Sequence, residues 1–218
     1  MAEIRLYGFW RSLASYRVRV ALRLKGLHFE ERSVDLLAGA QLSDEFAQVT
    51  ALRAVPVLEI DGTTLAQSLA ILEYLEETRP EVPLLPADPR ERAAARSMAL
   101  ATIADAHPLI VPRVRRYLSE RLSLGHDGIE AWGRHWLAEG LGTFERLLSR
   151  RPPAPFAFGE RVGIADIAVG SHVAGAELFA VPLDPYPHVR GLADALAEVD
   201  AFAQSHPSRL KPDANAHP

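Results

Sequence analysis

Gln67 and Ser68 stand where a short apolar strand pattern gives way to a helical one, and both side chains carry hydrogen-bond donors. A helix N-terminus offers unpaired backbone N–H groups and a partial positive charge, so added donors at this point suit a bound carboxylate. Taken alone, Ser68 is more typical of a helix N-cap. Ser12 is a second hydroxyl near the start of a helical pattern.

The 218-residue chain contains no cysteine. This excludes disulfides, thiolate metal sites and a cysteine nucleophile. Any thiol used in catalysis must therefore belong to a bound molecule. The eight histidines are dispersed, without a pair at i, i+4 spacing beside a carboxylate, so the sequence predicts no metal site. There is no glycine-rich phosphate loop, so nucleotide cofactors are not indicated.

A formal net charge of -4 and a pI near 6.1 lack the excess positive charge that is typical of nucleic-acid-binding proteins. The N-terminal residues lack a basic region followed by a long apolar stretch, so no secretory signal is visible. No run approaches the roughly 20 apolar residues of a membrane span. We therefore expect a cytoplasmic protein that binds neither nucleic acid nor membrane.

Strand and helix patterns alternate over the first 80 residues. The turn signal Asp61-Gly62 predicts a hairpin between the last two strands. Strands are expected over residues 4–9, 29–34, 56–60 and 63–65, and helices over 15–25, 42–49 and 67–78. The order is β-α-β-α-β-β-α.

Residues 80–89 carry four prolines, which predicts a linker. Strand patterns disappear after it. Helices are expected over residues 90–122, 128–151, 164–179 and 189–202, the first of them kinked or split at Pro108 and Pro112. The sequence thus predicts a small α/β domain over 1–80, a linker over 81–89 and an all-helical domain over 90–218.

Residues 10–22 read Trp-Arg-Ser-Leu-Ala-Ser-Tyr-Arg-Val-Arg-Val-Ala-Leu. This stretch resembles the Ser-Ser-Cys-x-Trp-Arg-Val-Arg-Ile-Ala-Leu pattern of zeta-class glutathione transferases, the maleylacetoacetate isomerases. It is at least as similar to the start of bacterial maleylpyruvate isomerases. The likeness continues through residues 67–77, 84–89 and 182–187. It implies an N-terminal thioredoxin-like domain that binds glutathione, followed by a C-terminal helical bundle that binds the substrate.

The resemblance also implies which residues hold glutathione. The proline of Val55-Pro56 is expected to be cis, so that the Val55 backbone pairs with the cysteinyl part of the ligand. Gln67-Ser68 is expected to grip the γ-glutamyl carboxylate. Arg53 is expected to meet the glycyl carboxylate, Asp105 to reach the γ-glutamyl amine, and His107 to lie near glutathione.

Ser12 aligns with the hydroxyl that activates the glutathione thiol in the family. A free thiol has a pKa near 8.5 and only its thiolate is nucleophilic, so the site must lower that value. Ser15 is expected to cap the first helix, with a lesser contact to the sulfur. Tyr7 is the alternative activator, because other classes of the family use an early tyrosine in this role.

Isomerases of this type add the thiolate to a conjugated cis double bond, allow rotation and expel glutathione. A dicarboxylate substrate develops an enolate, which fixed cations stabilise. Arg11 and Arg113 are the candidate cations, although Arg113 equally fits an exposed helix arginine. Arg17 and Arg19 point to different faces of one helix, and we interpret both as structural ion-pair formers.

Two departures from the family pattern bear on catalysis and substrate. The Ser-Ser-Cys triplet reads Ser12-Leu13-Ala14. A later arginine of maleylpyruvate isomerases falls here near Glu177 or Leu178, which counts against maleylpyruvate as substrate. A third departure concerns folding, since the Ser/Thr of a helix capping box is replaced by Gly163, while Asp166 is retained.

The leading hypothesis is a homodimeric, glutathione-dependent isomerase of a maleylacetoacetate-like acid with some transferase activity. Three alternatives stay open: a maleylpyruvate isomerase, a general glutathione transferase or dehalogenating enzyme, and a non-catalytic association module. The last is disfavoured because a scaffold does not need Ser12, Val55-Pro56 and Gln67-Ser68 together.

Overall fold

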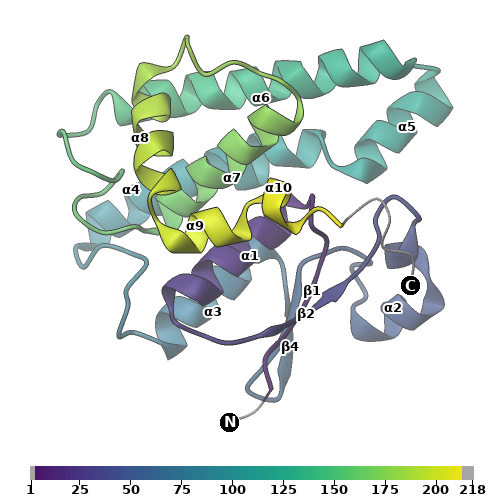
Figure 1. Ribbon diagram of the computed structural model, residues 1–218, viewed down its shortest axis with the longest axis horizontal. Coiled ribbons are helices and arrows are strands. Elements are labelled where there is room, and N and C mark those ends of the chain that lie inside the picture. Colours follow the sequence, from purple (N-terminus) through teal and green to yellow (C-terminus); the bar gives the residue numbers. More distant parts are fainter. Residues whose placement is uncertain (1–2, 213–218) are drawn as a thin grey trace. The chain divides into compact units, whose positions relative to one another are not determined.

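The computed structural model describes residues 3–212. The chain forms two compact units. The first consists of two segments, one that ends at Val82 and one that begins at Asp200, and the second spans Pro83–Val199. Figure 1 follows the chain by colour. The sequence places everything beyond residue 90 in one helical domain, whereas the structure groups the last two helices with the first unit. They are α9 (Asp200–Ser205) and α10 (Pro207–Leu210).

Side-chain contacts with α1 (Leu13–Leu24) explain this grouping. Phe202 is 3% exposed, and its ring meets the Tyr16 ring edge-to-face with centroids 6.3 Å apart. Arg23 Nε donates to Ser205 Oγ at 3.1 Å. These contacts join segments about 180 residues apart, and no local pattern in the sequence encodes them.

Four strands form one mixed sheet in the order β2-β1-β3-β4. β1 is parallel to β2 and antiparallel to β3, and β3 is antiparallel to β4. The turn between β3 and β4 has positive φ at both Asp61 (51°) and Gly62 (76°), as a two-residue hairpin turn requires. The strands are β1 (Arg5–Gly8), β2 (Glu30–Ser33), β3 (Val57–Ile60) and β4 (Thr63–Ala66).

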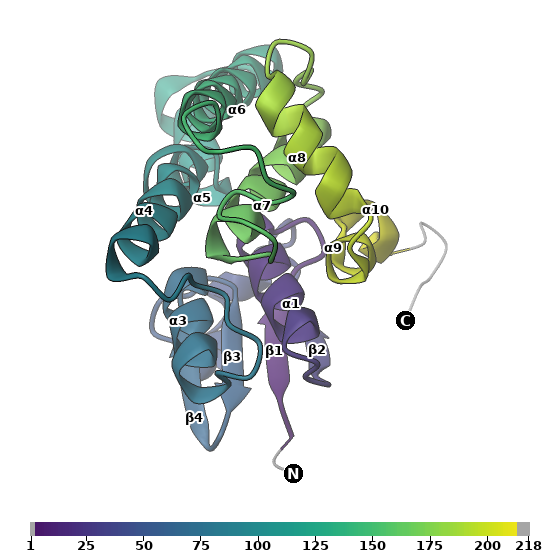
Figure 2. The same ribbon diagram turned by 90° about the vertical axis from the view of Figure 1, so that its left-hand side faces the viewer.

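The sheet has a helix layer on each face. Successive side chains of a strand alternate between the two faces, so alternate residues pack against each layer. Leu6 and Leu58 are fully buried under α1 and α3 (Ser68–Thr78), which lie side by side in Figure 2. On the other face, Val57 packs with Phe46 of α2 (Asp44–Val49). The expected order β-α-β-α-β-β-α is confirmed.

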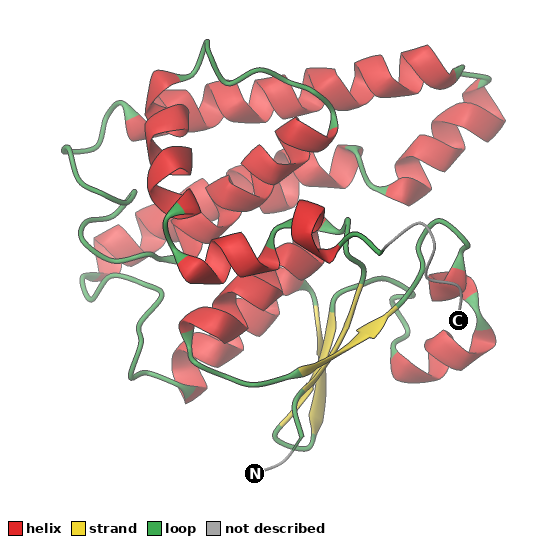
Figure 3. Ribbon diagram, in the orientation of Figure 1, coloured by secondary structure: helices red, strands yellow, loops and turns green. Residues whose placement is uncertain are grey.

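The second unit is built from helices (Figure 3). Every residue of α7 from Ile164 to Ala176 is buried, because α4, α6 and α8 pack around it. Among residues 3–212, no helix has both the length and the hydropathy of a membrane span. The helices are α4 (Pro89–Leu100), α5 (Pro112–Leu122), α6 (His126–Leu148), α7 (Ile164–Leu178) and α8 (Pro187–Ala197).

The helix expected over residues 90–122 is split, as the prolines predict, but the break begins before them. A π turn runs over Ala101–Ala106 and a 3-10 turn over His107–Leu109. Pro108 has no N–H to donate, and its ring would clash with a carbonyl of the preceding α turn. The wider π turn accommodates this conflict.

His172 of α7 braces the π turn from inside the unit. Its Nε2 donates to the Leu137 carbonyl at 2.9 Å, which leaves Nδ1 to accept from Thr102 Oγ1 at 2.7 Å. His172 and Thr102 are both 0% exposed. The imidazole therefore ties the π turn to α6 and α7.

The glycine that departs from the capping-box pattern has a steric reason. A Cβ on Gly163 would lie 2.7 Å from the Leu84 carbonyl oxygen, which accepts from the Ile164 N–H at 2.8 Å. Serine or threonine therefore does not fit at the start of α7. Asp166 keeps its half of the box, because its Oδ2 accepts from the Gly163 N–H at 2.8 Å.

Candidate functional site

Ser12 is the N-cap of α1. Its Oγ accepts from the Ser15 N–H at 3.2 Å, and its own N–H donates to the Phe9 carbonyl at 2.9 Å. Because Oγ already accepts a hydrogen bond, the hydroxyl hydrogen remains to donate to a ligand. The side chain is half-buried and lies at the positive end of the helix dipole. This arrangement suits a bound thiolate.

The prediction that Ser15 caps the helix is wrong, because Ser12 holds that position. Ser15 is 0% exposed, and its Oγ accepts from the Phe9 N–H at 3.4 Å. Its hydroxyl therefore supports the loop between β1 and α1. Of the two serines, Ser12 is the one that reaches the surface.

An ion pair between buried Arg19 and exposed Glu31 supports the same loop. Arg19 Nε lies 3.0 Å from both carboxylate oxygens of Glu31, and Arg19 Nη2 donates to the Phe9 carbonyl at 2.6 Å. A Cβ on Gly8 would lie 2.5 Å from Glu31 Oε1, so the ion pair needs glycine at the end of β1. The ion pair expected for Arg19 is confirmed.

The segment before β3 presents free backbone. The Val55–Pro56 peptide bond is cis, as the resemblance implies. Within residues 3–212, the N–H and C=O of Val55 make no hydrogen bond. An extended peptide could therefore pair with Val55 as a strand pairs with a sheet edge.

The N-terminus of α3 has Gln67 as its N-cap, with φ 71° and no hydrogen bond from the side chain to the first turn. Ser68 is thus the first helical residue, and its interpretation as an N-cap is wrong. Ser68 is 3% exposed, and its Oγ accepts from Arg17 Nε at 3.0 Å. Sequence reasoning missed this contact. The available signal was an arginine within the apolar run of α1.

Arg53 is exposed and already has partners. Its guanidinium donates to the Leu42 carbonyl at 2.7 Å and lies 3.4 Å from Asp44 Oδ1. An exposed pair of this kind is worth about 0–1 kcal/mol, so a ligand carboxylate can displace Asp44 at little cost. Arg11 is half-buried, and its side chain makes no hydrogen bond or ion pair with residues 3–212.

Three predicted site residues belong to the second unit. Asp105 is exposed on the π turn, His107 opens the 3-10 turn, and Arg113 is exposed in the first turn of α5. Asp105 and His107 lie in the break between α4 and α5, and Arg113 follows it in α5. In the part of the chain that the structure describes, no cluster of His, Asp and Glu could hold a metal ion.

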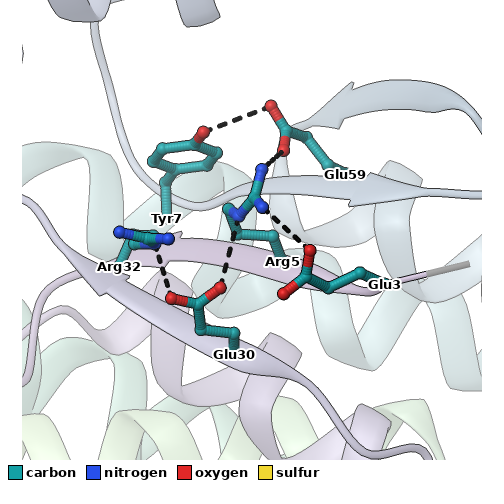
Figure 4. Close-up of polar contacts among 6 residues, drawn as sticks. All are labelled: Glu3, Arg5, Tyr7, Glu30, Arg32 and Glu59. Atoms are coloured by element: carbon teal, nitrogen blue, oxygen red, sulfur yellow. Dashed lines mark hydrogen bonds and ion pairs between the residues drawn. The ribbon is translucent and has the colours of Figure 1, made fainter.

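Tyr7 already has a hydrogen-bond partner, in the cluster of charged side chains around Arg5 and Glu59 that Figure 4 shows. Its hydroxyl donates to Glu59 Oε1 at 3.2 Å, and Glu59 Oε2 accepts from Arg5 at 2.9 Å. Tyr7 also packs against Phe46, on the α2 face of the sheet. The geometry therefore favours Ser12 over Tyr7 as the thiol activator.

Known proteins match this chain over nearly its whole length. A family model of the glutathione S-transferase N-terminal domain matches residues 2–77. Maleylacetoacetate isomerase of Rattus norvegicus is 39% identical over 213 residues, which make up 97% of this chain and 95% of that protein. The chain belongs to the maleylacetoacetate isomerase family.

Solved structures of the family superpose closely. Maleylacetoacetate isomerase from Methylobacterium extorquens AM1, with bound malonate and glutathione, is 43% identical with a TM-score of 0.92, over 95% of this chain and 98% of that chain. A maleylpyruvate isomerase described as a bacterial zeta-class glutathione transferase is 37% identical with a TM-score of 0.92, over 96% and 99%.

The start of α1 reads Ser12-Leu13-Ala14, where the resembled family motif has Ser-Ser-Cys. Leu13 is 6% exposed and Ala14 is 9% exposed. The positions of the second serine and the cysteine of the motif thus face the interior here, and apolar side chains fill them. Ser12 keeps the half-buried position at the cap.

Proposed function

We propose that the chain is a glutathione-dependent cis–trans isomerase of a maleylacetoacetate-like dicarboxylic acid, with glutathione transferase activity. The observation that carries the proposal is the Ser12 hydroxyl, which caps α1 and still has a hydrogen to donate. The free Val55 backbone and the α3 N-terminus belong to the same unit. The glutathione and malonate bound in the Methylobacterium extorquens relative support both ligands.

Glutathione binds along the first unit in this proposal. The Val55 backbone pairs with the cysteinyl residue. Gln67 and Ser68 receive the γ-glutamyl carboxylate at the positive end of α3. Arg53 exchanges its exposed partner Asp44 for the glycyl carboxylate. Asp105 and His107 are the remaining residues that the family resemblance implies for glutathione.

Ser12 activates the thiol by donating its hydroxyl to the sulfur. The thiolate gains this hydrogen bond and the field of the α1 N-terminus, and both lower the thiol pKa from its usual value of about 8.5. No cysteine of the chain competes for the electrophile, because the sequence has none.

The reaction proceeds by addition and elimination. The thiolate attacks one carbon of the conjugated cis double bond, a C–S bond forms, and the π electrons move to the carbonyl oxygen as an enolate. Rotation occurs about the resulting single bond. Collapse of the enolate restores the double bond in the trans geometry and expels the thiolate. Arg11 and Arg113 hold the substrate carboxylates and stabilise the enolate.

The proposal includes a cytoplasmic homodimer, in keeping with the family resemblance of the whole chain. Sedimentation at micromolar concentration tests the dimer directly. A monomeric peak would remove that part of the proposal and leave the chemistry of Ser12 unaffected.

The decisive experiment measures glutathione-dependent conversion of maleylacetoacetate to the fumaryl isomer by wild type, Ser12→Ala and Ser43→Ala. Ser43 is a matched control, since it caps α2 by accepting from the Phe46 N–H at 3.1 Å. Each substitution removes one N-cap, at about 1 kcal/mol of stability. We expect kcat to fall tenfold or more, about 1.4 kcal/mol of barrier, only for Ser12→Ala.

Two outcomes would contradict the proposal in different ways. Full activity of Ser12→Ala would remove Ser12 as the activator. Absence of turnover by a wild-type protein that binds glutathione would move the chain to transferases of another electrophile. Faster turnover of maleylpyruvate than of maleylacetoacetate would instead identify the chain as a maleylpyruvate isomerase.

A further inference from the structure

A buried arginine lies directly behind the proposed grip on the γ-glutamyl carboxylate. Arg17 is in the middle of α1 and is 2% exposed. Its Nε donates to Ser68 Oγ at 3.0 Å, which joins α1 to the first residue of α3 across 51 positions of sequence. Burial lowers the pKa of Arg17 to about 9, so the side chain remains charged at neutral pH.

This contact sets the direction in which the Ser68 hydroxyl can donate. A serine oxygen that accepts from a guanidinium must point its own hydrogen away from that guanidinium. The remaining directions include the helix N-terminus, where Gln67 provides no side-chain cap. The Arg17 contact therefore presents Ser68 as a donor to an anion at this helix end.

The charge of Arg17 acts in the same direction as the helix dipole. Both place positive potential at the α3 N-terminus, and charges screened from water interact more strongly than exposed ones. A carboxylate bound there gains from the dipole, from Ser68 and from the buried cation. Its binding would in turn offset part of the cost of burying the guanidinium.

We propose that Arg17 is a positioning residue for glutathione, which orients Ser68 toward the γ-glutamyl carboxylate and supplies buried positive charge behind it. The inference rests on the proposed function, because it assumes that glutathione binds at the α3 N-terminus. It replaces the interpretation of Arg17 as a purely structural residue.

The test compares two ligands by titration calorimetry. One is S-methylglutathione, and the other is its analogue with γ-aminobutyrate in place of the γ-glutamyl residue, which keeps the amine and lacks only the α-carboxylate. The Kd of the analogue divided by the Kd of S-methylglutathione is the ratio that measures what the α-carboxylate contributes to binding. We expect Arg17→Met to lower this ratio about tenfold, while KM for glutathione rises and kcat at saturating glutathione changes less than threefold.

Arg23→Met is the matched control. Arg23 lies on the same helix and makes the same kind of bond, Nε to Ser205 Oγ at 3.1 Å, but it contacts α9 instead of α3. Its loss should leave the ratio of Kd values unchanged. If both variants lower the ratio equally, the effect is a general consequence of disturbing α1 and the inference is wrong.

Two further variants keep the inference testable if Arg17→Met does not fold. Arg17→Lys keeps most of the volume and an amine that can carry the charge, so it should fold and retain an intermediate ratio. Ser68→Ala should lower the ratio, and Arg17→Lys added to it should lower the ratio no further. Independent, additive effects of Arg17→Lys and Ser68→Ala would refute the proposed coupling.

The proposed function and the role of Arg17 can be refuted separately. A wild-type protein that does not bind S-methylglutathione would overturn the proposed function itself. A wild type that binds it with a large ratio, together with an Arg17→Met or Arg17→Lys variant that keeps the full ratio, would overturn only the role of Arg17.

Discussion

Asp166 is a buried carboxylate whose protonation should change the stability of the fold. It is 0% exposed, and its two oxygens accept from the Ala157 and Gly163 N–H groups at 2.8 Å each. These hydrogen bonds favour the charged form, while burial disfavours it. Burial has the larger effect and raises the pKa of Asp166 from 3.8 to about 6.

The sign of the pH dependence follows from the raised pKa. The folded chain binds the proton more tightly than the unfolded chain, so the stabilisation is complete below pH 3.8 and is lost as pH rises through about 6. The rise in pKa corresponds to about 3 kcal/mol in total, at roughly 1.4 kcal/mol per pH unit. Between pH 7 and pH 4, about 2.4 kcal/mol of this appears.

Asp166→Asn removes this titration and keeps the shape of the side chain. The free energy of unfolding of wild type minus that of Asp166→Asn should therefore increase by about 2.4 kcal/mol from pH 7 to pH 4. Urea unfolding followed by tryptophan fluorescence measures both proteins at each pH. Equal protein concentration and ionic strength keep any association and screening constant.

Asp61→Asn is a control of opposite sign. Hydrogen bonds from Arg79 and Tyr74 lower the pKa of Asp61, so the stability it contributes is lost as pH falls. Its difference from wild type should shrink toward acid. A wild-type minus Asp166→Asn difference that also shrinks would refute the reasoning, since the hydrogen bonds of Asp166 would then outweigh its burial. A constant difference would mean that the two effects cancel.

Two further predictions concern a glycine and a tyrosine. A Cβ on Gly140 of α6 would overlap the His172 imidazole, so Gly140→Ala should cost about 1–3 kcal/mol in thermal or urea unfolding. Gly191→Ala, in open space on α8, should instead stabilise by about 0.5–1 kcal/mol; equal effects would contradict the packing. Tyr7→Phe should change isomerase turnover less than twofold, because the hydroxyl is bonded to Glu59, and a tenfold loss would restore Tyr7 as the activator.

Local patterns in the sequence determine the order of the elements. Alternating and helical periods in the first 80 residues predict β-α-β-α-β-β-α, and the structure has this order. The Asp61-Gly62 turn and the break near Pro108 follow from backbone rules that depend on one or two residues. Motifs of adjacent residues, such as Val55-Pro56 and Gln67-Ser68, carry the family resemblance.

Tertiary packing decides which partner each polar side chain takes. The choice of Ser12 over Ser15 as cap depends on where the Phe9 backbone lies relative to α1. The contact of Arg17 with Ser68 exists only because α1 and α3 pack together on one face of the sheet.

The same reason explains the remaining differences. Thr102 of the π turn bonds to His172 of α7, and Gly163 is required because the Leu84 carbonyl lies against it. The sequence by itself thus determined the elements, their order and the residue types at the site, since these depend on neighbours along the chain. Only the tertiary structure decided the hydrogen-bond partners and the buried charges, because those depend on residues that are distant in sequence.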